Sequence, residues 1–330
     1  MSDDGSGPHV AAATERADAG PGEHEGFDDT WLALREGADD RARDRTLEST
    51  LAEALERRGR CRILDLGAGT GANLRRLAPR FGHDQRWTLV DRDTTLLGRL
   101  DARLAPWADR HGARVGTAGD NDGRVADDDD DDAAGDGKTL LIRADTFGAR
   151  VRRRRADLAT SLDALPFASH DLIAGSALLD LAGADWLDTL AARAAAAGCE
   201  VLFALSYDGR LHWTPSLEDD RAVQELFDRH QRQDKGLGLA LGPDAGAHFA
   251  ERLRRHGLDV TTARSDWTLG AADGALQHEL ATGLATAATE LEPDFAPRAA
   301  AWLEARRASL DTGRQRLVVG HLDVLGSPPR

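Results

Sequence analysis

The sequence predicts an α/β protein built on a doubly wound, mostly parallel sheet. Between about residues 60 and 207, apolar strand-like segments alternate with helix-like segments, a pattern typical of βαβ units. The first strand-like segment, ILDL, runs directly into a glycine-rich turn, GAGTG, and then into a helical pattern. Hydrophobic residues make up 41% of the 330 residues, enough to form a real core.

Composition excludes several classes of protein. No apolar run approaches the roughly 18 residues that span a bilayer, and the N-terminus lacks the pattern of a signal peptide. The net charge of −15 disfavours a nucleic-acid substrate because an acidic surface repels phosphates. The only cysteines, Cys61 and Cys199, each adjoin a strand-like run. They fit buried thiols of a cytoplasmic protein better than a disulfide framework.

The N-terminal part divides into two segments. Residues 1–26 have few large apolar side chains and are predicted to form a disordered leader. Residues 27–59 are predicted to form a helical cap, with Asp39 or Asp40 at the start of its main helix and Gly59 at its end. The apolar stripe of this helix is Leu47, Leu51 and Leu55.

The core, residues 60–207, follows in order. The acidic segment 116–138, with six consecutive aspartates, interrupts the alternation and is predicted to be a solvated surface insertion. The predicted strands lie at 61–69, 86–91, 139–143, 150–155, 171–181 and 200–208, and the predicted helices at 71–81, 94–112 (with a proline kink) and 184–198.

Residues 208–330 are predicted to form a helical substrate or lid region that also supplies the last strands of the sheet. The glycine-rich run Gly236–Gly242 is incompatible with a plain helix. The predicted helices are 217–233, 244–256, 274–291 and 296–312, and the predicted strands are 258–267 and 316–326.

The glycine turn indicates a ligand that carries a positive charge. Gly67, Gly69 and Gly71 form G-x-G-x-G, whereas a dinucleotide fold needs G-x-G-x-x-G. Asp65 stands two residues before the first glycine. A carboxylate at this position repels a pyrophosphate and attracts an ammonium group.

A second acid indicates a ribose. Asp91 ends the second predicted strand, 24 residues after Gly67, where an acid accepts hydrogen bonds from ribose hydroxyls in nucleotide-binding folds. A ligand with a ribose and a cationic amino-acid end satisfies both observations. S-adenosylmethionine has both.

Residues 60–207 contain four segments in this order: ILDLGAGTG, LVDRD, RRADLATSLDALPFASHDLIAGSALLDL and VLFALSY. Because of these segments, residues 60–207 resemble the class I S-adenosylmethionine-dependent methyltransferases. The resemblance implies a Rossmann-like, seven-stranded doubly wound sheet. It implies that backbone at Gly67, Ala68 and Gly69 holds the methionine part, Asp65 its amino group and Asp91 the ribose. It also implies that Asp157 and Leu158 meet the adenine and that Ser176 lies where cofactor and substrate meet. Gly71 and Arg92 are the remaining cofactor-binding residues that it implies. Arg35 is a candidate partner of the cofactor carboxylate.

The missing motifs narrow the acceptor. Asn/Asp-Pro-Pro-aromatic, typical of enzymes that methylate base amino groups, is replaced by GSALLD, and the sequence contains no Pro-Cys pair. Neither H-E-x-x-H nor a paired C-x-x-C occurs, so no metal site is predicted. The expected acceptor is a small molecule.

The candidate catalytic residues lie at the end of the predicted strand 200–208 and beyond it. Tyr207, His230 and Lys235 are the groups expected to orient or deprotonate the acceptor. Lys235 is one of only two lysines beside 40 arginines, so its ammonium group is a candidate for a specific role. Trp213 and Trp267 are expected to fill the core. The other polar and aromatic residues of this region are Asp208, His212, Gln231 and Asp234.

Three other functions stay open at this point. They are a catalytically silent S-adenosylmethionine-binding regulator, an aminopropyl transferase on the same fold, and a nicotinamide dehydrogenase, which the glycine spacing and Asp65 disfavour. The sequence leaves open the acceptor, the role of the acidic insertion, and whether helices 274–312 form a lid or a homodimer surface.

Overall fold

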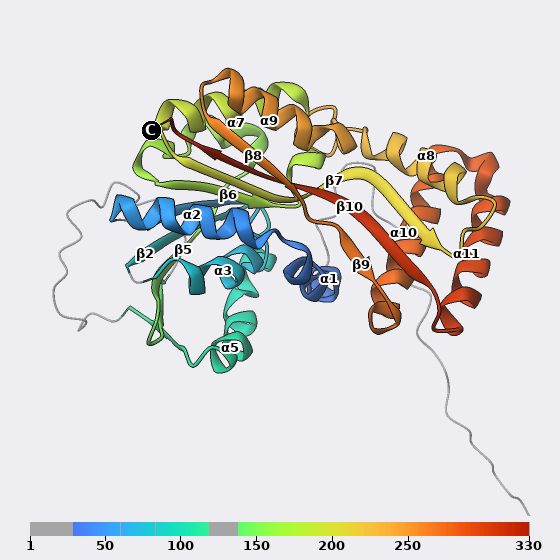
Figure 1. Ribbon diagram of the computed structural model, residues 1–330, viewed down its shortest axis with the longest axis horizontal. Helices are drawn as coiled ribbons and strands as arrows, with labels where there is room; N and C mark the ends of the chain where they lie inside the picture. Colours follow the sequence, from blue (N-terminus) through green and yellow to red (C-terminus); the bar gives the residue numbers. More distant parts are fainter. Residues whose placement is uncertain (1–28, 60, 83, 119–137, 330) are drawn as a thin grey trace, which may run out of the picture.

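A computed structural model describes residues 29–59, 61–82, 84–118 and 138–329 (Figure 1). The predicted leader, 1–26, and residues 119–137 of the predicted acidic insertion lie outside this part of the chain. The strands are β1 (Cys61–Leu66), β2 (Gln85–Asp91), β3 (Arg114–Thr117), β4 (Leu140–Arg143), β5 (Gly148–Arg155), β6 (Leu172–Ser176), β7 (Glu200–Thr214), β8 (Asp259–Arg264), β9 (Trp267–Leu269) and β10 (Arg316–Ser327).

The helices agree closely with the predicted ones beyond residue 60. The α-helices are α1 (Asp29–Ala42), α2 (Arg45–Arg58), α3 (Ala72–Leu77), α4 (Thr94–Gly98), α5 (Leu100–Arg110), α6 (Leu158–Ser161), α7 (Ala184–Ala197), α8 (Asp220–Gln231), α9 (Ala245–Arg255), α10 (Gly274–Leu291) and α11 (Ala296–Asp311). The predicted helix with a proline kink is divided into α4 and α5, and Pro106 lies inside α5.

One sheet organises the described chain, in the order β3-β4-β5-β2-β1-β6-β7-β10-β8, with β9 paired to β10. β1 pairs in parallel with β2 on one side and with β6 on the other. The chain winds outward from β1 in both directions, so the switch point lies between β1 and β6. The doubly wound α/β fold predicted from the alternation is confirmed.

The sheet is larger than predicted. The seven strands that the resemblance implies are present as β5-β2-β1-β6-β7-β10-β8. β4 matches the strand predicted at 139–143, and β3 and β9 were not predicted as separate strands, so the described residues form a sheet of 10 strands. β3 and β4 form an antiparallel pair on either side of residues 119–137 and extend the β5 edge. A four-residue strand such as β3 shows little burial and no alternation, so its sequence carries no strand signal.

The end of the strand predicted at 200–208 was predicted wrongly. It was expected at Asp208, but β7 continues to Thr214. The extension pairs antiparallel with β10, from Thr214 opposite Arg316 to Tyr207 opposite His321. The first residues of the predicted helical substrate region are therefore part of the sheet, because β10 supplies hydrogen-bonding partners that lie more than 100 residues further along the chain.

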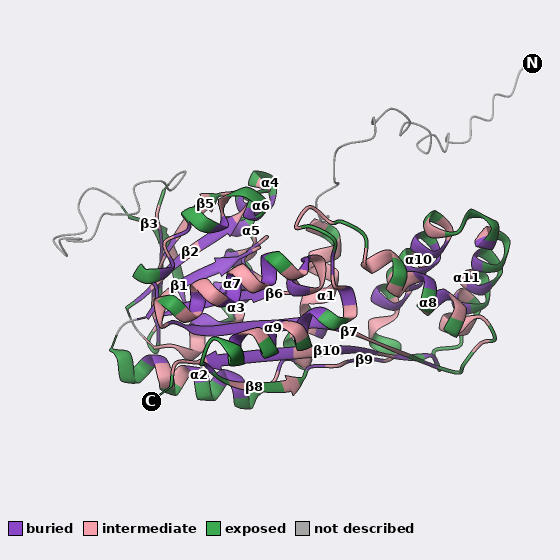
Figure 2. Cartoon of the chain, turned by 90° about the horizontal axis from the view of Figure 1, so that it is seen from above, coloured by how far each residue is buried: buried purple, intermediate pink, exposed green. Residues whose placement is uncertain are grey.

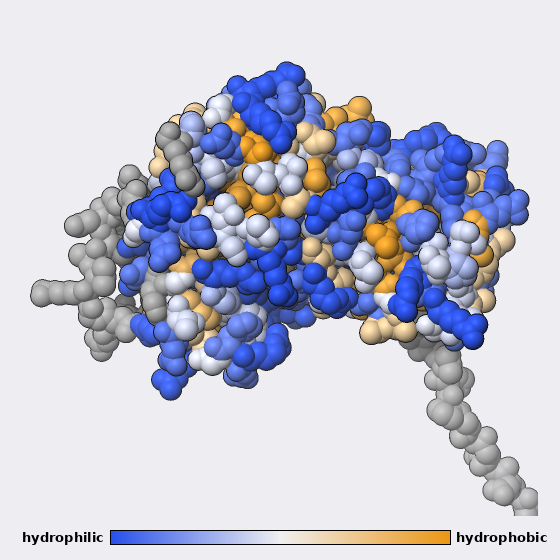
Figure 3. All heavy atoms as spheres, in the orientation of Figure 1, coloured by the Kyte–Doolittle hydropathy of each residue, from blue (hydrophilic) through white to orange (hydrophobic). Residues whose placement is uncertain are grey.

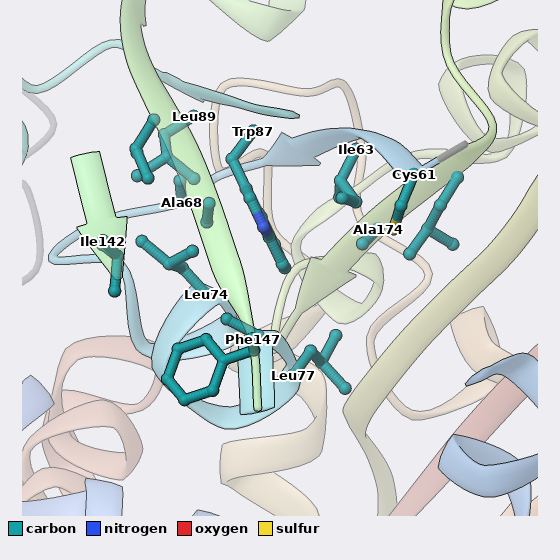
Figure 4. Packing of buried hydrophobic residues seen from close by; sticks show 14 of the residues in the cluster. Cys61, Ile63, Ala68, Leu74, Leu77, Trp87, Leu89, Ile142, Phe147 and Ala174 are labelled. Atoms are coloured by element: carbon teal, nitrogen blue, oxygen red, sulfur yellow. The ribbon is translucent and has the colours of Figure 1, made fainter. Parts of the chain in front are cut away.

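Helices cover both faces of the sheet. α2, α3 and α5 lie on one face and α7 and α9 on the other (Figure 1). The strands between them are the most buried part of the molecule (Figure 2). Figure 4 shows Ile63, Leu74 and Trp87 among the side chains that fill the first of these layers. Cys61 and Cys199 are buried free thiols, as predicted.

A third core lies where β7 and β10 extend beyond the main sheet. There α8, α10 and α11 gather around the two strands (Figure 1). Trp213 and Trp267 are 5% and 3% exposed and belong to this core, which confirms that they fill space in it. The guanidinium of Arg306 is stacked 4.5 Å from the ring centroid of Trp213 and pairs with Asp220.

The start of the main N-terminal helix also differs from the prediction. Asp39 and Asp40, expected to begin it, lie inside the separate helix α1. α2 begins after Asp44, whose carboxylate accepts a hydrogen bond from the backbone N–H of Leu47 at 2.8 Å. Gly59 ends α2 in the left-handed conformation, as predicted. Three candidate aspartates occur within six residues, and only their backbone conformations distinguish the cap.

The surface is largely polar. Figure 3 shows a mostly hydrophilic face on which apolar side chains are divided among small areas. Among the described residues, the large apolar side chain with high exposure is Leu239, at 73%. No helix in the described part of the chain is both long and apolar enough to cross a bilayer.

We expect Leu51→Ala to lower the free energy of unfolding by about 2–5 kcal/mol, because it leaves a cavity under α2. Leu51 is fully buried. Urea denaturation followed by circular dichroism measures the loss. Thr50→Ala, at the exposed neighbouring position, is the control and should change stability by less than about 0.5 kcal/mol. Equal effects of the two substitutions would contradict the packing of α2 against the sheet.

Candidate functional site

The glycine turn leaves the carboxyl end of β1 at the switch point of the sheet. Gly67, Gly69 and Gly71 have φ values of 64°, 52° and 78°, a region that side chains rarely adopt. A Cβ on Gly71 would lie 2.5 Å from Cδ1 of Leu100, and one on Gly67 would lie 3.3 Å from Cδ1 of Leu178. Backbone strain and close packing therefore both require glycine here. Gly71 precedes the first residue of α3, so the turn leads into a helix N-terminus.

Asp91 is fixed against this turn. Its Oδ2 accepts a hydrogen bond from the backbone N–H of Gly69 at 2.7 Å, and its Oδ1 accepts one from Asp93 at 2.9 Å. Burial raises the pKa of Asp91, and the two backbone donors oppose this rise. Each carboxylate oxygen has two lone pairs, so both can still accept from a ligand hydroxyl.

Asp65 is a buried carboxylate with one oxygen unused. The residue is 1% exposed, and its Oδ1 accepts a hydrogen bond from the side-chain amide of Asn73 at 2.8 Å. Oδ2 is buried without a hydrogen-bonding partner among the described residues. Burial raises the pKa of Asp65 to about 7, although Asn73 and the charge of Arg43 lower it. An unpaired buried carboxylate oxygen is costly, and a cationic donor on a ligand would satisfy it.

The helix α1 lies over the glycine turn. Cδ1 of Leu32 is 3.5 Å from where a Cβ on Gly69 would be. Nε of Arg75 binds Glu36 of α1 at 2.7 Å, while its Nη1 donates to the carbonyl of Thr70 in the turn at 2.6 Å. Residues 29–42 thus form a cap held by these polar contacts and by the packing of Trp31, Leu34 and Ala38 against the third core.

Arg35 of this cap already has partners. Its guanidinium forms two hydrogen bonds with Asp39, at 2.9 and 3.1 Å, and lies 5.0 Å from the ring centroid of Trp267. Asp39 in turn accepts a hydrogen bond from the indole N–H of Trp267 at 3.0 Å. If Arg35 binds the cofactor carboxylate, as predicted, its guanidinium must bind that carboxylate and Asp39 at the same time.

The remaining predicted cofactor residues lie at the carboxyl ends of β2, β5 and β6. Asp157 is exposed and caps α6 by accepting a hydrogen bond from the backbone N–H of Ala159 at 3.0 Å. Leu158 is buried, and its carbonyl accepts from the indole of Trp186 at 2.8 Å. Ser176 ends β6 and is half-buried. Arg92 is exposed, and its Nη1 is 3.5 Å from a Cβ position on Gly236.

Tyr207 is unsuited to act as a base in this conformation. Its hydroxyl donates to Oδ1 of Asp228 at 2.8 Å, and its ring packs edge-on against Phe227. Burial and the nearby charge of Asp228 raise the pKa of the phenol, so the hydroxyl stays protonated at neutral pH. It therefore functions here as a buried donor.

His230 and Lys235 form a separate pair. Nζ of Lys235 lies 3.4 Å from Nδ1 of His230, and Nε2 of His230 lies 3.1 Å from a carboxylate oxygen of Glu290. Burial lowers the pKa of both groups, and the charge of Lys235 lowers that of His230 further. The structure thus divides the three predicted catalytic residues into two groups with different partners, Asp228 and Glu290.

Asp180 was missed by the sequence reasoning. It lies in a short 3-10 helix, Leu179–Leu181, directly after β6, and its Oδ1 is buried without a hydrogen-bonding partner. Burial raises its pKa to about 6, opposed by backbone N–H groups including that of Tyr207 and by the charge of Arg35. The available signal was an acid four residues past Ser176, at the sheet edge where ligands bind.

His321 was missed as well. It lies opposite Tyr207 on β10, is 4% exposed, and has an Nδ1 without a hydrogen-bonding partner in the described chain. Burial and then Arg35 lower its pKa to about 3, so the imidazole is neutral. The charge of Arg35 on α1 influences the pKa values of both Asp180 and His321.

Among the described residues, no three His, Cys, Asp or Glu side chains are grouped so that they could hold a metal ion.

No protein-family model and no curated protein matches the sequence. Solved structures with a similar fold include a cyclopropane-fatty-acyl-phospholipid synthase-like protein from Lactobacillus casei (15% identity, 91% of this chain and 94% of that chain covered, TM-score 0.44). Another is an S-adenosylmethionine-dependent methyltransferase from Geobacter sulfurreducens in complex with S-adenosyl-L-homocysteine (18% identity, 91% and 98% covered, TM-score 0.40). A third is an arsenic(III) S-adenosylmethionine methyltransferase from Chlamydomonas reinhardtii (14% identity, 82% and 64% covered, TM-score 0.38). The chain spans less than two thirds of the Chlamydomonas protein.

We expect Gly71→Ala to lower the free energy of unfolding by about 2–4 kcal/mol, because it adds a close contact to backbone strain. The added methyl would meet buried Leu100, whereas Gly198, with a φ of 65°, has nothing within 4 Å of its Cβ position. Gly198→Ala is therefore the matched control, which isolates strain alone. Thermal unfolding of both variants measures the difference, and equal melting temperatures would contradict the packing of the turn.

We expect Asp180→Asn to stabilise the protein above pH 6. Because burial raises the pKa of Asp180 to about 6, ionising it costs folding free energy as pH rises from about 4 to 6. The gain should reach about 3 kcal/mol at most by pH 7.5 and vanish below about pH 4. Denaturant unfolding across this range measures it. Asp185→Asn, at an exposed site on α7, is the control; a wild-type protein as stable as Asp180→Asn at pH 7.5 would count against the buried carboxylate.

Proposed function

We propose that this protein is an S-adenosylmethionine-dependent methyltransferase that acts on a small-molecule acceptor. The observation that carries the proposal is the pair of aspartates around the glycine turn. Asp65 has a buried oxygen without a partner, and Asp91 is hydrogen-bonded to the turn itself. One aspartate suits an ammonium group and the other suits ribose hydroxyls. These groups occur together in S-adenosylmethionine, and the sequence motifs of residues 60–207 support the same ligand.

The residues present fit this cofactor. Asp65 would bind the amino group, backbone at Gly67, Ala68 and Gly69 would hold the methionine part, and Asp91 would bind the ribose. Asp157 and Leu158 would flank the adenine, with Arg92, Gly71 and Ser176 completing the cofactor site. When bound, the cofactor supplies a methyl group activated by its sulfonium. The protein's part is to align this group with the acceptor and exclude water, a role for which α1 is placed over the turn.

The acceptor would bind beneath α1, beside Asp180 and His321. A hydroxyl or amine nucleophile loses a proton when it is methylated, and the carboxylate of Asp180 can accept that proton because its pKa of about 6 leaves it mostly ionised at neutral pH. Tyr207 would help to position the acceptor from its fixed place in β7, opposite His321, and would not act as a base. Within this proposal His230 and Lys235 belong to the adjoining helical region. The net charge of −15 supports a small acceptor rather than a nucleic acid.

We expect S-adenosylmethionine and S-adenosylhomocysteine to bind with micromolar dissociation constants and NAD not to bind. Asp91→Ala should weaken both sulfur ligands at least about tenfold by removing the ribose acceptor. Isothermal titration calorimetry measures all of these affinities at low and high salt. Asp109→Ala, at an exposed position on α5, is the control and should bind like the wild type.

The same titrations discriminate the other functions. Tighter binding of decarboxylated S-adenosylmethionine would indicate an aminopropyl transferase. Binding of the intact cofactor without methyl transfer to any of a broad set of amines, phenols and acids would indicate a regulatory protein. A folded sample that binds neither sulfur ligand would refute the proposed cofactor.

A further inference from the structure

Two buried polar residues to which the proposed function gives no role, Arg43 and Asn73, connect the helical cap to Asp65 by hydrogen bonds. Arg43, in the link between α1 and α2, is 5% exposed, and its Nη1 donates to the side-chain oxygen of Asn73 at 2.6 Å. Asn73, on α3, is 3% exposed, and its Nδ2 donates to Oδ1 of Asp65 at 2.8 Å. The two hydrogen bonds therefore connect the helical cap to the carboxylate at the end of β1.

Arg43 is also tied to the rest of the fold. Its Nε lies 3.1 Å from Oε1 of Glu48, which is 1% exposed. Glu48 pairs in addition with Arg76 at 2.8 Å and Arg80 at 3.0 Å. Next to Arg43, the backbone N–H of Asp44 donates to Asp323 of β10 at 3.0 Å. The guanidinium of Arg43 is therefore held by its ion pair with Glu48 and by the hydrogen bond from Nη1 to Asn73, while Nε and Nη2 are buried without a hydrogen-bonding partner in the described chain. Because Arg43 is buried in this setting, its position constrains that of the Asn73 amide.

The amide of Asn73 has one role consistent with these distances. Its oxygen accepts from Arg43, so its nitrogen must face Asp65, and the amide cannot turn over without losing both hydrogen bonds. Oδ1 of Asp65 is thereby occupied and Oδ2 is left for another donor. Within the described protein, the groups that influence the charge of Asp65 are Asn73, Arg43 and Asp91, of which only Asp91 disfavours ionisation.

We propose that Arg43 and Asn73 are positioning residues that orient Asp65 and favour its charged form for binding the amino group of the cofactor. This inference rests on the proposed function. It couples recognition of the amino-acid end of the ligand to the seating of the α1–α2 cap, because Arg43 belongs to the link between the two helices. Binding of the nucleoside end by Asp91 does not involve the hydrogen bonds of Arg43 and Asn73.

Two ligands that differ in the amino-acid end test the proposal. S-adenosylhomocysteine carries the ammonium group, and 5′-methylthioadenosine has the same nucleoside thioether without it. We expect Arg43→Gln and Asn73→Ala each to weaken S-adenosylhomocysteine about tenfold or more at pH 7, measured by calorimetry. Both should leave 5′-methylthioadenosine binding within about twofold of the wild type. Arg45→Gln, an exposed arginine two residues away, is the matched control and should affect neither ligand.

The pH dependence gives a second readout. Wild-type affinity for S-adenosylhomocysteine should rise between pH 6 and pH 8 and binding should release a proton near pH 7, because burial raises the pKa of Asp65 to about 7. Without the positive charge of Arg43 this pKa rises further, so the Arg43→Gln defect should be smaller at pH 8 than at pH 6. Proton release is measured in two buffers of different ionisation enthalpy.

The outcomes are distinct. Equal weakening of both ligands at every pH would mean that Arg43 and Asn73 only support the fold, and would overturn the inference. Unchanged binding of S-adenosylhomocysteine by both variants would overturn it as well. Failure of the wild type to bind either ligand would instead refute the proposed function. Because Asn73→Ala leaves the Arg43–Glu48 pair intact, it tests the inference even where Arg43→Gln does not fold.

Discussion

The structure depends on the parallel pairing of β1 with a neighbour on each side. Because β2 and β6 both run parallel to β1, the chain must leave its carboxyl end in a tight turn before it can form α3. That turn needs positive φ angles, and it leaves polar backbone and Asp65 in a dry part of the molecule. The cap α1 packs over this turn, Asp91 accepts a hydrogen bond from it, and Asn73 donates one to Asp65.

The polar groups of the candidate site have a common energetic feature. Asp65 and His321 are buried and Asp180 is half-buried; each has a buried hydrogen-bonding atom that is unused among the described residues, and burial disfavours the charged form of each. Such groups destabilise a fold unless a ligand provides the missing hydrogen bond. Shifted pKa values of this kind are common where a binding or catalytic site lies.

The pairing of β7 with β10 has a different consequence. It extends two strands past the main sheet and forms a separate apolar core with α8, α10 and α11, which also includes Ala38 of α1. Tyr207 and His321 stand opposite each other where the two parts meet. The helical region therefore contributes to the candidate acceptor site through strands fixed in the sheet and not through a loose loop.

The sequence by itself determined the α/β class, the seven strands of the winding, the late helices and the glycine turn with its two aspartates, because each has a local signature. Hydrophobic period, glycine spacing and an acid at a strand end are properties of short segments. Only the tertiary structure decided the extent of β7, the strands β3 and β9, the cap at Asp44 and the partners of Tyr207, His230 and Lys235. It also brought Arg43, Asn73, Asp180 and His321 to the site. These features depend on hydrogen bonds and burial between segments far apart in the chain, which no local pattern records.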